Sequence, residues 1–507
     1  MSEFVIHNFA PIMFVALVFF MLFGFPVAFA LAANGLFFAF IGIELDLLPF
    51  ELLQALPNRV LGILSNDTLL AIPFFTFMGL ILERSGMAED LLDTIGQLFG
   101  PVRGGLAYAV VFVGALLAAT TGVVAASVIS MGLISLPIML RFNYDRRLAA
   151  GVIAASGTLA QIIPPSLVLI MLADQLRIAG QISVGDMYQG AIVPGLVLTA
   201  LYAAYVFGLS IIWPNRAPAL PLEARTLRGF KLLRRAIFSL VPPLLLIFLV
   251  LGTILIGVAT PTEGGAMGAA GALILALLNR RLRWSLLRQA MDTTAKLTAF
   301  VIFILIGATC FSLTFNGVKG DHWVESLLIG LPGGWLGFLI IVNLMVFLLA
   351  FFLDFFELAF IIVPLLASTA VKLLSPVVAT MFGPGIGDPT TLALVWFGVL
   401  LGLNMQTSFM HPPFGFALFY LRSVAPDKPY VDKITKAHIA PVTTGQIYWG
   451  AVPFVVIQLI MVAVVIAFPK LVFLGIERHE LKDPSQIKIE APRATPDDED
   501  SGLPKIK

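Results

Sequence analysis

Polar side chains gather at two points where a Pro-Pro pair interrupts a long apolar run. The first stretch reads SGTLAQIIPPSLVLIM over residues 156–171, and the second reads NMQTSFMHPPFGFALF over residues 404–419. Proline removes a backbone donor and clashes with the preceding turn, so each pair leaves carbonyl oxygens upstream without helical partners. Hard cations prefer shells of carbonyl, hydroxyl and carboxylate oxygens. The pattern predicts two broken helices whose interruptions could hold a cation.

A simpler interpretation is open for each break taken alone. Serine and threonine in membrane helices often bond back to their own backbone beside a proline kink. Two breaks of matching pattern favour a binding site over two unrelated kinks, because unwound backbone persists at membrane depth only inside protein or beside water. The oxygen-bearing residues at the breaks are Ser156, Thr158, Asn404, Thr407 and Ser408.

Acidic residues and one histidine extend the possible chemistry. Asp354 and Glu357 lie in an otherwise apolar segment, where a carboxyl usually faces a cavity or marks an ion path; cation coordination by Asp354 competes with a structural role, and Glu357 could lie at the interface. Glu263 begins an apolar segment and is expected to act as an N-terminal helix charge, with the glycines after it forming a close helix contact. His411 could titrate or bond substrate, or simply be a packed donor.

The composition describes an all-α polytopic membrane protein. The chain has 507 residues, of which 59% are hydrophobic and 12% charged, against roughly 45–50% and about 25% in soluble domains. Apolar stretches long enough to cross a bilayer recur from Phe9 to Phe473, with no room for a soluble domain between them, and we expect the first to be a retained helix. The single cysteine, Cys310, excludes disulfides, iron–sulfur clusters and thiolate metal sites. The net charge of +1 gives no indication of a nucleic-acid partner.

Two apolar segments, 104–140 and 335–371, are too long for one crossing and have polar centres, ATTGVVAAS and FFLDFFELA. We interpret both as re-entrant hairpins that return to the side from which they came. With the N-terminus outside, most basic residues then fall in cytoplasmic loops, as the positive-inside rule requires. These residues are Arg84, Arg103, Arg141, Arg146, Arg147, Arg216, Arg225, Arg228, Lys231, Arg234, Arg235, Arg280, Arg281, Arg283, Arg288, Arg422, Lys428, Lys433 and Lys436, and the opposite loops hold only Arg59, Arg177, Lys319 and Lys372.

This arrangement predicts an inverted repeat. Each half has a segment, a hairpin, a broken helix and a closing helix, and the two hairpins open to opposite sides; inverted repeats with discontinuous helices are typical of secondary transporters. The predicted organisation is an N-terminal scaffold (1–67), a first repeat (68–213, with hairpin 104–140 and broken helix 148–172), a basic interfacial segment with linking scaffold helices (214–292), a second repeat (293–474, with hairpin 335–371 and broken helix 390–420) and a disordered polar tail (475–507). The basic segment 225–235 is expected to be an interfacial amphipathic helix.

No sequence typical of an enzyme or a nucleotide-driven pump is present. Walker A, H-E-x-x-H and G-x-S-x-G patterns do not occur, and the five histidines are scattered. We therefore expect no enzyme activity and no cofactor, with energy coming from an ion gradient or another subunit.

Several strings resemble the large permease subunit of tripartite ATP-independent periplasmic (TRAP) transporters. They are AIPFFTFMGLILERSGM (71–87), VRGGLAYAVV (102–111), ATTGVVAASVISMGLISLPIML (119–140), YDRRLAAGVIAASGTLAQIIPPS (144–166) and TPTEGGAMGA (260–269). The TTGVVAAS variant is similar to the branch associated with mannitol, chloroaromatic compounds and 2-oxoacids. The family's first hairpin often carries Ser-Gly-Ser and a later Asp, where this chain has Thr121-Gly122-Val123 and Ser127.

The resemblance implies sodium-driven, elevator-type uptake of carboxylates in the bacterial inner membrane. It implies as partners a small four-helix membrane subunit and a periplasmic substrate-binding protein, with sodium as the coupling ion. The expected sodium ligands are Thr120, Thr121, Gly122, Ser127, Ser156, Gly157, Asp354, Asn404 and Thr407, and the expected substrate contacts are Thr158, Pro164, Pro165, Ser408, His411, Pro412 and Pro413. Alternatives are a stand-alone sodium/anion symporter of the same architecture and, less favoured, a membrane enzyme or channel.

Overall fold

The computed structural model describes residues 2–121, 124–225, 229–382, 387–412, 415–432 and 435–476. These residues are almost entirely helical, and the strands among them form one short antiparallel pair, β1 (Tyr430–Val431) and β2 (His438–Ile439). Eight helices in this part of the chain are long and apolar enough to cross a membrane, or ten if each of two bent pairs counts as one span.

The described helices divide between the first and the second half of the chain. The first half contains α1 (Ser2–His7), α2 (Phe9–Leu22), α3 (Val27–Glu44), α4 (Leu56–Leu64), α5 (Asp67–Arg84), α6 (Met87–Phe99), α7 (Gly105–Thr121), α8 (Val124–Arg141), α9 (Arg146–Thr158), α10 (Leu167–Leu176) and α11 (Val184–Ile212). The second contains α12 (Gly229–Leu255), α13 (Pro261–Leu278), α14 (Trp284–Gly317), α15 (Gly320–Ile329), α16 (Gly334–Leu349), α17 (Phe355–Glu357), α18 (Val363–Phe382), α19 (Pro389–Met405), α20 (Phe416–Val424), α21 (Thr444–Ala467) and α22 (Lys470–Phe473).

Short polar residues fix where many of these helices begin. A Ser, Thr, Asn or Asp at the N-cap accepts a hydrogen bond from a first-turn amide that has no helical partner. Such caps are Asn66 for α5, Asp145 for α9, Ser166 for α10, Ser183 for α11, Thr260 for α13, Asp388 for α19 and Thr443 for α21. The cap of α13 includes Glu263, which accepts from the Thr260 amide, so its expected role at a helix start is confirmed.

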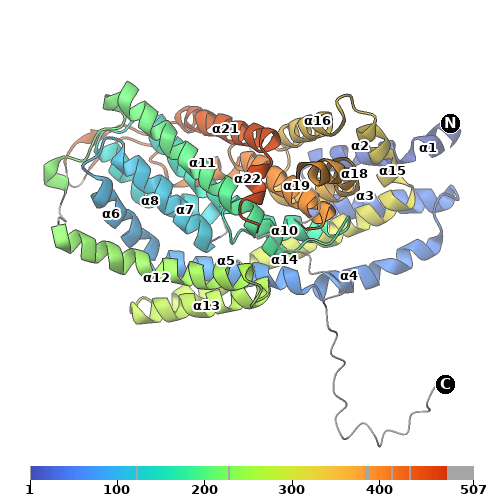
Figure 1. The fold of residues 1–507 in the computed structure, drawn as a ribbon, viewed down its shortest axis with the longest axis horizontal. Helices are drawn as coiled ribbons and strands as arrows, with labels where there is room; N and C mark the ends of the chain where they lie inside the picture. Colours follow the sequence, from blue (N-terminus) through green and yellow to red (C-terminus); the bar gives the residue numbers. More distant parts are fainter. Residues whose placement is uncertain are drawn as a thin grey trace, which may run out of the picture.

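The first hairpin enters and leaves on one side. The amide of Gly104, just before α7, donates to the carbonyl of Ala217, and the amide of Asp145, after α8, donates to the carbonyl of Arg216. Both ends of the hairpin therefore contact the same loop. Helices α7 and α8 lie at the opposite end of the molecule from the second hairpin, α16 and α18 (Figure 1).

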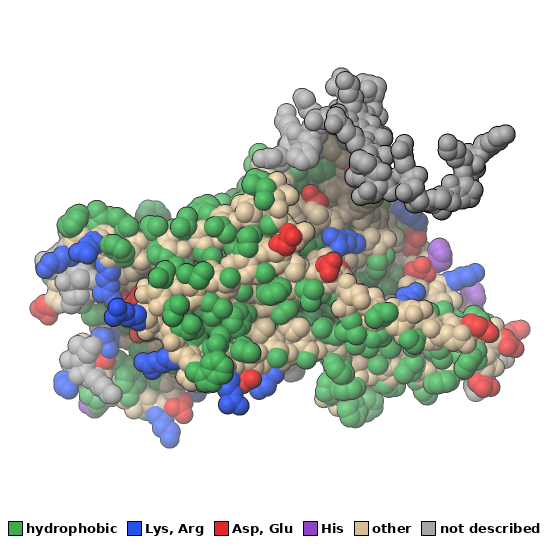
Figure 2. Space-filling model, turned by 90° about the horizontal axis from the view of Figure 1, so that it is seen from below, with side chains coloured by type: hydrophobic (Ala, Val, Ile, Leu, Met, Phe, Trp, Pro, Cys, Tyr) green, Lys and Arg blue, Asp and Glu red, His purple; other side chains and the backbone are tan. Residues whose placement is uncertain are grey.

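The loops predicted to be cytoplasmic lie together at one end. Arg84 donates to Gln289 and Thr293, and Arg281 pairs with Asp90, so residues from two segments far apart in sequence meet there. Figure 2 shows Lys and Arg side chains gathered at the left-hand end, with hydrophobic side chains covering the length beyond it. This is the charge asymmetry expected of a protein whose basic end faces the cytoplasm.

Scaffold helices of one half pack along scaffold helices of the other half: α3 packs along α14, and α5 packs along α13. Glycines allow the close approach. A methyl group at Gly307 would lie 2.3 Å from the carbonyl oxygen of Ala28, and one at Gly268 would lie 2.5 Å from the sulfur of Met78. The expected glycine contact of α13 is therefore present, with α5 as its partner.

The basic segment and the polar tail differ in how far the structure describes them. The basic residues from 229 to 235 are the first turns of the long helix α12 rather than a separate interfacial helix, because the apolar run that follows continues the same helix; residues 226–228 lie outside the described part. The tail expected to be disordered falls almost wholly outside the described residues as well.

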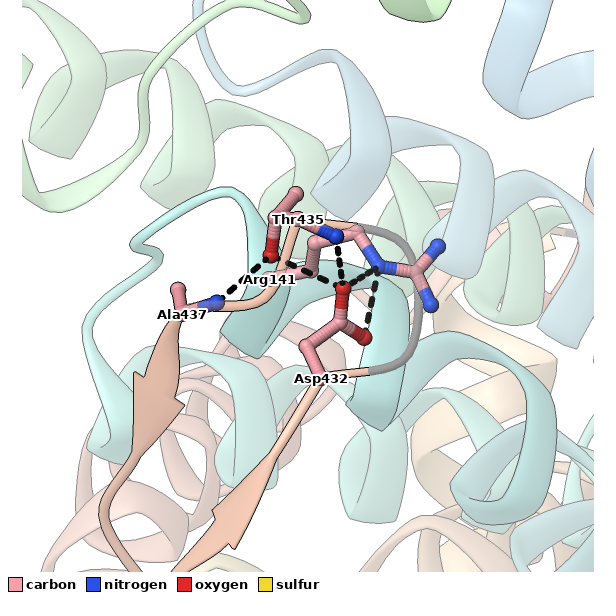
Figure 3. Close-up of polar contacts among 4 residues, drawn as sticks. All are labelled: Arg141, Asp432, Thr435 and Ala437. Carbon is pink, nitrogen blue, oxygen red and sulfur yellow. Dashed lines mark hydrogen bonds and ion pairs between the residues drawn. The ribbon is translucent and has the colours of Figure 1, made fainter.

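At the basic end, a loop of the second repeat binds the base of the first hairpin (Figure 3). The Nε of Arg141, the last residue of α8, donates to both carboxylate oxygens of Asp432, at 3.0 and 3.1 Å. The amide and hydroxyl of Thr435 also donate to Asp432, at 2.7 and 2.8 Å. The Thr435 amide, its hydroxyl and the Arg141 guanidinium together lower the pKa of Asp432 to about 2, so this carboxylate stays charged at neutral pH.

Candidate functional site

The first predicted helix break is present. Helix α9 gives way to a short 3-10 turn at Leu159–Gln161, and α10 begins at Leu167. Pro164 and Pro165 lie in the non-helical residues between them, joined by a cis peptide bond. Ser166 bonds across the break and caps α10. Its hydroxyl donates to the carbonyl of Gln161 at 2.6 Å and accepts from the Leu169 amide.

The second break repeats this pattern. Helix α19 ends in a 3-10 turn, Gln406–Phe409, and α20 begins at Phe416. Pro412 lies in the non-helical stretch, and Pro413 lies outside the described residues. Asn404 stands as far before Pro412 as Ser156 stands before Pro164. The two breaks are thus equivalent positions of the repeat.

The two breaks touch each other. Gln406 Nε2 donates to the hydroxyl of Thr158 at 3.0 Å, and these two residues occupy matching places in their respective stretches. Gln458 of α21 donates to the hydroxyl of Tyr202 of α11 at 2.9 Å and approaches Thr158 at 3.5 Å. All four side chains are buried. A polar network therefore joins both broken helices to both closing helices.

Each break also contacts the hairpin of its own repeat. Asn404 Nδ2 donates to the carbonyl and side-chain oxygens of Asn343 in α16, at 2.7 and 3.0 Å. In the first repeat Ser156 lies against Gly114 of α7, where an added methyl group would be 2.5 Å from the Ser156 Cβ. Gly157 lies equally close to α8, because a methyl group added at Gly157 would be 2.4 Å from Val128 Cγ2. The breaks and hairpins form one tightly packed unit.

Three fully buried oxygens at the breaks have no hydrogen-bond partner in the structure: Ser156 Oγ, Asn404 Oδ1 and Gln406 Oε1. A buried polar atom left without a partner costs about 1–3 kcal/mol. Oxygens are the atoms that a hard cation accepts as ligands, so this donor set suits such an ion. Two of the three, Ser156 and Asn404, are residues whose type and spacing predict cation binding.

Other predicted ligands bond back to their own helices. Thr158 donates to the carbonyl of Ala155, Thr407 to that of Asn404 and Ser408 to that of Met405, at 2.7–2.8 Å. Such bonds to the preceding turn are the geometry expected of a simple proline kink. A hydroxyl that donates keeps its lone pairs, so the geometry leaves a second role available to each. Ser127 is buried on α8, whereas Gly122 and the side chains of Thr120 and Thr121 lie outside the described part.

Asp354 and Glu357 form a capping box at the tip of the second hairpin. The Glu357 amide donates to Asp354 Oδ1 at 3.0 Å, and the Asp354 amide donates to Glu357 Oε2 at 3.1 Å. The structural role considered for Asp354 is therefore real. The capping box uses one carboxylate oxygen of Asp354, and the other oxygen leaves a role in cation binding open.

His411 is packed between aromatic rings of the second hairpin. Its ring stacks on Phe351 at 4.1 Å between centroids and meets Phe347 edge-on at 4.5 Å. The side chain is 2% exposed. His411 thus joins the second break to the hairpin arm, in keeping with the packed role considered for it.

A cavity of about 330 Å³ lies where the breaks and hairpin tips come together. Its lining residues come from the first hairpin (Val124, Ala125), the two broken helices (Gln161, Leu167, Phe409, Phe416, Tyr420), the second hairpin tip (Asp354, Phe355, Phe356) and α14 (Leu297, Phe300). Both halves of the repeat thus contribute to one enclosure, in the size range of small-molecule sites.

Sequence reasoning missed several residues of this region. Gln406, Gln458 and Asn343 make the contacts that hold the breaks together, and Gln161 lines the cavity with an unpartnered oxygen. Asn343 and Gln458 are amide side chains within apolar runs, IIVNLMVF and VVIQLIMV, whereas Gln161 and Gln406 lie within the two break sequences. An isolated amide in a membrane helix was the signal that could have found Asn343 and Gln458.

Residues 14–471 match the family described as the tripartite ATP-independent periplasmic transporter, DctM component. The chain belongs to this family. Because the match covers nearly all of the described helices, the resemblance based on the hairpin and break sequences is confirmed.

Individual relatives agree with this DctM assignment. The chain is 28% identical over 481 residues to the C4-dicarboxylate TRAP transporter large permease protein DctM of Rhodobacter capsulatus, covering 91% of this chain and 99% of that protein. It is 31% identical to the protein of the same name from Pseudomonas aeruginosa, over 70% of this chain and 77% of that one. The 2,3-diketo-L-gulonate TRAP transporter large permease YiaN of Escherichia coli is 26% identical, over 90% and 96%.

Among solved structures, the YdaH transporter of Alcanivorax borkumensis has a similar fold. The TM-score is 0.53 at 14% identity, over 84% of this chain and 90% of that one. A large TRAP permease is a multi-pass protein of the bacterial inner membrane, and the chain is accordingly a transporter component rather than an enzyme.

Proposed function

We propose that this chain is the translocating subunit for sodium-coupled uptake of small organic acids. In this proposal a periplasmic binding protein delivers the acid, and a small four-helix membrane subunit completes the complex. The observations that support it are the cavity lined by both breaks and both hairpin tips and, within the breaks themselves, the buried, unpartnered oxygens of Ser156, Asn404 and Gln406.

Coupling would follow from the packing of breaks against hairpins. A cation held by Ser156 and Asn404 would satisfy buried oxygens and hold each break against its own hairpin, through Gly114 and Asn343. Ordering the hairpin tips completes the wall of the cavity. The cation and the organic acid would then raise each other's affinity, since such coupling is reciprocal.

Movement of the cavity across the membrane would be of the elevator type. Leu297 and Phe300 line the cavity from the middle of α14, one of the scaffold helices. The hairpins and broken helices would move as one unit along the scaffold helices α3, α5, α13 and α14.

Uptake of labelled carboxylates into proteoliposomes tests this function. The liposomes would contain the full chain with its small subunit, with and without an inward sodium gradient and an added binding protein. We expect uptake to require both, and Asp354→Asn to weaken its sodium dependence. Uptake that needs sodium but no binding protein would instead support a stand-alone symporter, and uptake indifferent to sodium would contradict the proposed coupling.

A further inference from the structure

The cavity at the breaks is lined by an unusual number of aromatic rings. Six of its twelve lining residues are aromatic: Phe300, Phe355, Phe356, Phe409, Phe416 and Tyr420. They come from α14, the second hairpin tip and the second broken helix. The first repeat contributes Val124, Ala125, Gln161 and Leu167, none of which is aromatic, so the aromatic character belongs to one wall of the cavity.

The rings of this wall contact one another. Phe356 meets Phe300 edge-on at 5.5 Å and lies 3.8 Å from Phe355, which in turn lies 5.5 Å from Phe409. Phe416 stacks with Tyr420 at 6.3 Å. Rings at such spacing leave faces and edges for a further ring, because aromatic pairs prefer edge-to-face and offset arrangements.

The polar groups of the cavity are few and carry no positive charge. Among the described lining residues only Gln161, Asp354 and Tyr420 have polar side chains, and none is Lys, Arg or His. Gln161 Oε1 is buried without a hydrogen-bond partner. A solute with two carboxylates would have to desolvate both of them here with no basic side chain to pair with, which is costly at low dielectric.

We propose that the transported solute is a monocarboxylate with an aromatic body. This inference rests on the proposed function, because the single carboxylate would need a coupling cation between itself and Asp354. The ring would lie against Phe356 and Phe409, where apolar surface is removed from water. A hydroxyl on the ring could donate to Gln161 Oε1.

Thermal unfolding of the purified complex of the full chain with its small subunit tests the solute class. Phenylacetate, succinate and gluconate are added in sodium chloride or choline chloride, and the unfolding midpoint is followed by tryptophan fluorescence. A ligand that binds the folded state raises the midpoint. We expect phenylacetate in sodium to raise it, and succinate and gluconate to leave it unchanged; 2-phenylethanol, which has the ring without the carboxylate, controls for partitioning into detergent.

Variants of the aromatic wall tie the effect to this cavity. Phe356→Leu and Phe409→Leu keep apolar volume but remove a ring, and each should weaken the apparent affinity for phenylacetate by about two- to ten-fold, the range for one aromatic contact. Phe338→Leu is the matched control, because Phe338 is buried and stacked on Phe397 away from the cavity. It should leave the apparent affinity unchanged.

The outcomes separate this inference from the proposed function. A sodium-dependent shift with succinate or gluconate but not with phenylacetate would overturn the aromatic assignment and leave sodium-coupled uptake standing. A phenylacetate shift that is lost in the wall variants but is equal in choline would support the solute class and count against sodium coupling. No shift with any acid, or shifts indifferent to the wall variants, would overturn the inference.

Discussion

At the scale of single residues, Ser156 and Asn404 occupy matching positions of the two repeats but contact their hairpins in different ways. Asn404 uses its amide nitrogen to hold Asn343 of the adjacent hairpin, leaving its oxygen unpartnered. Ser156, which faces Gly114, is too short for such a bond and packs directly, again with its oxygen unpartnered. Different side chains thus present a buried oxygen at equivalent places, which is the property that a cation site requires.

Removing the Ser156 hydroxyl should separate ion binding from stability. Because Ser156 Oγ makes no hydrogen bond, Ser156→Ala should leave the unfolding midpoint unchanged or slightly higher. If the hydroxyl is a sodium ligand, the sodium concentration for half-maximal uptake should rise by about ten-fold, corresponding to roughly 1.4 kcal/mol. The control is Ser135→Ala, which removes another buried, unpartnered hydroxyl in a separate pocket that no residue of the breaks lines. Equal sodium dependence in both variants would contradict the assignment.

The bond between the breaks should matter for both stability and transport. Gln406→Met preserves length but removes the amide that donates to Thr158, and we expect it to lower stability by about 1–2 kcal/mol, as loss of a buried hydrogen bond does. Uptake should fall more than stability does, because the two breaks would no longer be held in register. Thr253→Val, which removes a hydroxyl bonded only to its own helix, should affect neither. A Gln406→Met protein with full uptake would show that the contact is only structural.

At the scale of elements, the close approach of the first break to its hairpin gives a steric test. Gly157→Ala would place a methyl group 2.4 Å from Val128 Cγ2, so α8 and α9 must move apart. Overpacking of this kind costs about 1–3 kcal/mol, and uptake should fall several-fold. Adding Val128→Ala removes the clashing methyl group and should restore most of the stability and most of the uptake. Failure of the double variant to recover would indicate that the glycine is needed for another reason; Gly62→Ala, which meets open space, is the control.

The contact between Arg141 and Asp432 joins two elements at the basic end and has a defined pH dependence. The folded pKa of Asp432, about 2, lies below the value of about 3.9 in an unfolded chain. Its stabilisation is therefore fully present above about pH 4 and is lost as the pH falls toward 2. Asp432→Asn should lower the unfolding midpoint at neutral pH and flatten its decline in that acid range. The exposed pair of Asp93 and Arg235 provides the control, because Asp93→Asn should have little effect at any pH.

Local sequence predicted the elements well, for a physical reason. Proline removes a helical hydrogen bond, and both breaks lie where a Pro-Pro pair follows a polar stretch, so they could be placed within a few residues. Pro242 and Pro243, by contrast, lie inside the continuous helix α12. Charge distribution across the membrane predicted that segment 104–140 returns to its own side, which the contacts of Gly104 and Asp145 with one loop confirm. The bond between Thr158 and Gln406 could not be predicted in this way, because the rotation of each helix about its axis is set by packing between segments far apart in the sequence.

At the scale of the whole molecule, the packing of the two halves against each other separates a rigid frame from the part that holds the cavity. Each of α5 and α14 packs along a helix of the opposite half, α13 and α3, through glycine-mediated contacts. Such contacts give a wide, continuous interface. The hairpins meet this frame through side chains such as Phe356 against Phe300 and Ser130 bonded to Glu83, and contacts of this kind can be broken without disturbing the frame.

Cysteine cross-links can test that division directly. The single native cysteine is first replaced, Cys310→Ala, and the pair Phe300→Cys and Phe356→Cys is introduced where α14 meets the second hairpin tip. Oxidation should then arrest uptake by at least about ten-fold, and a reductant should restore it, because an elevator cycle requires these two residues to separate. The pair Phe29→Cys and Phe303→Cys joins α3 to α14 at a comparable ring distance, 6.1 Å against 5.5 Å. Since both helices belong to the frame, its oxidation should leave uptake intact; arrest by both cross-links, or by neither, would contradict movement of the hairpin unit along a fixed scaffold.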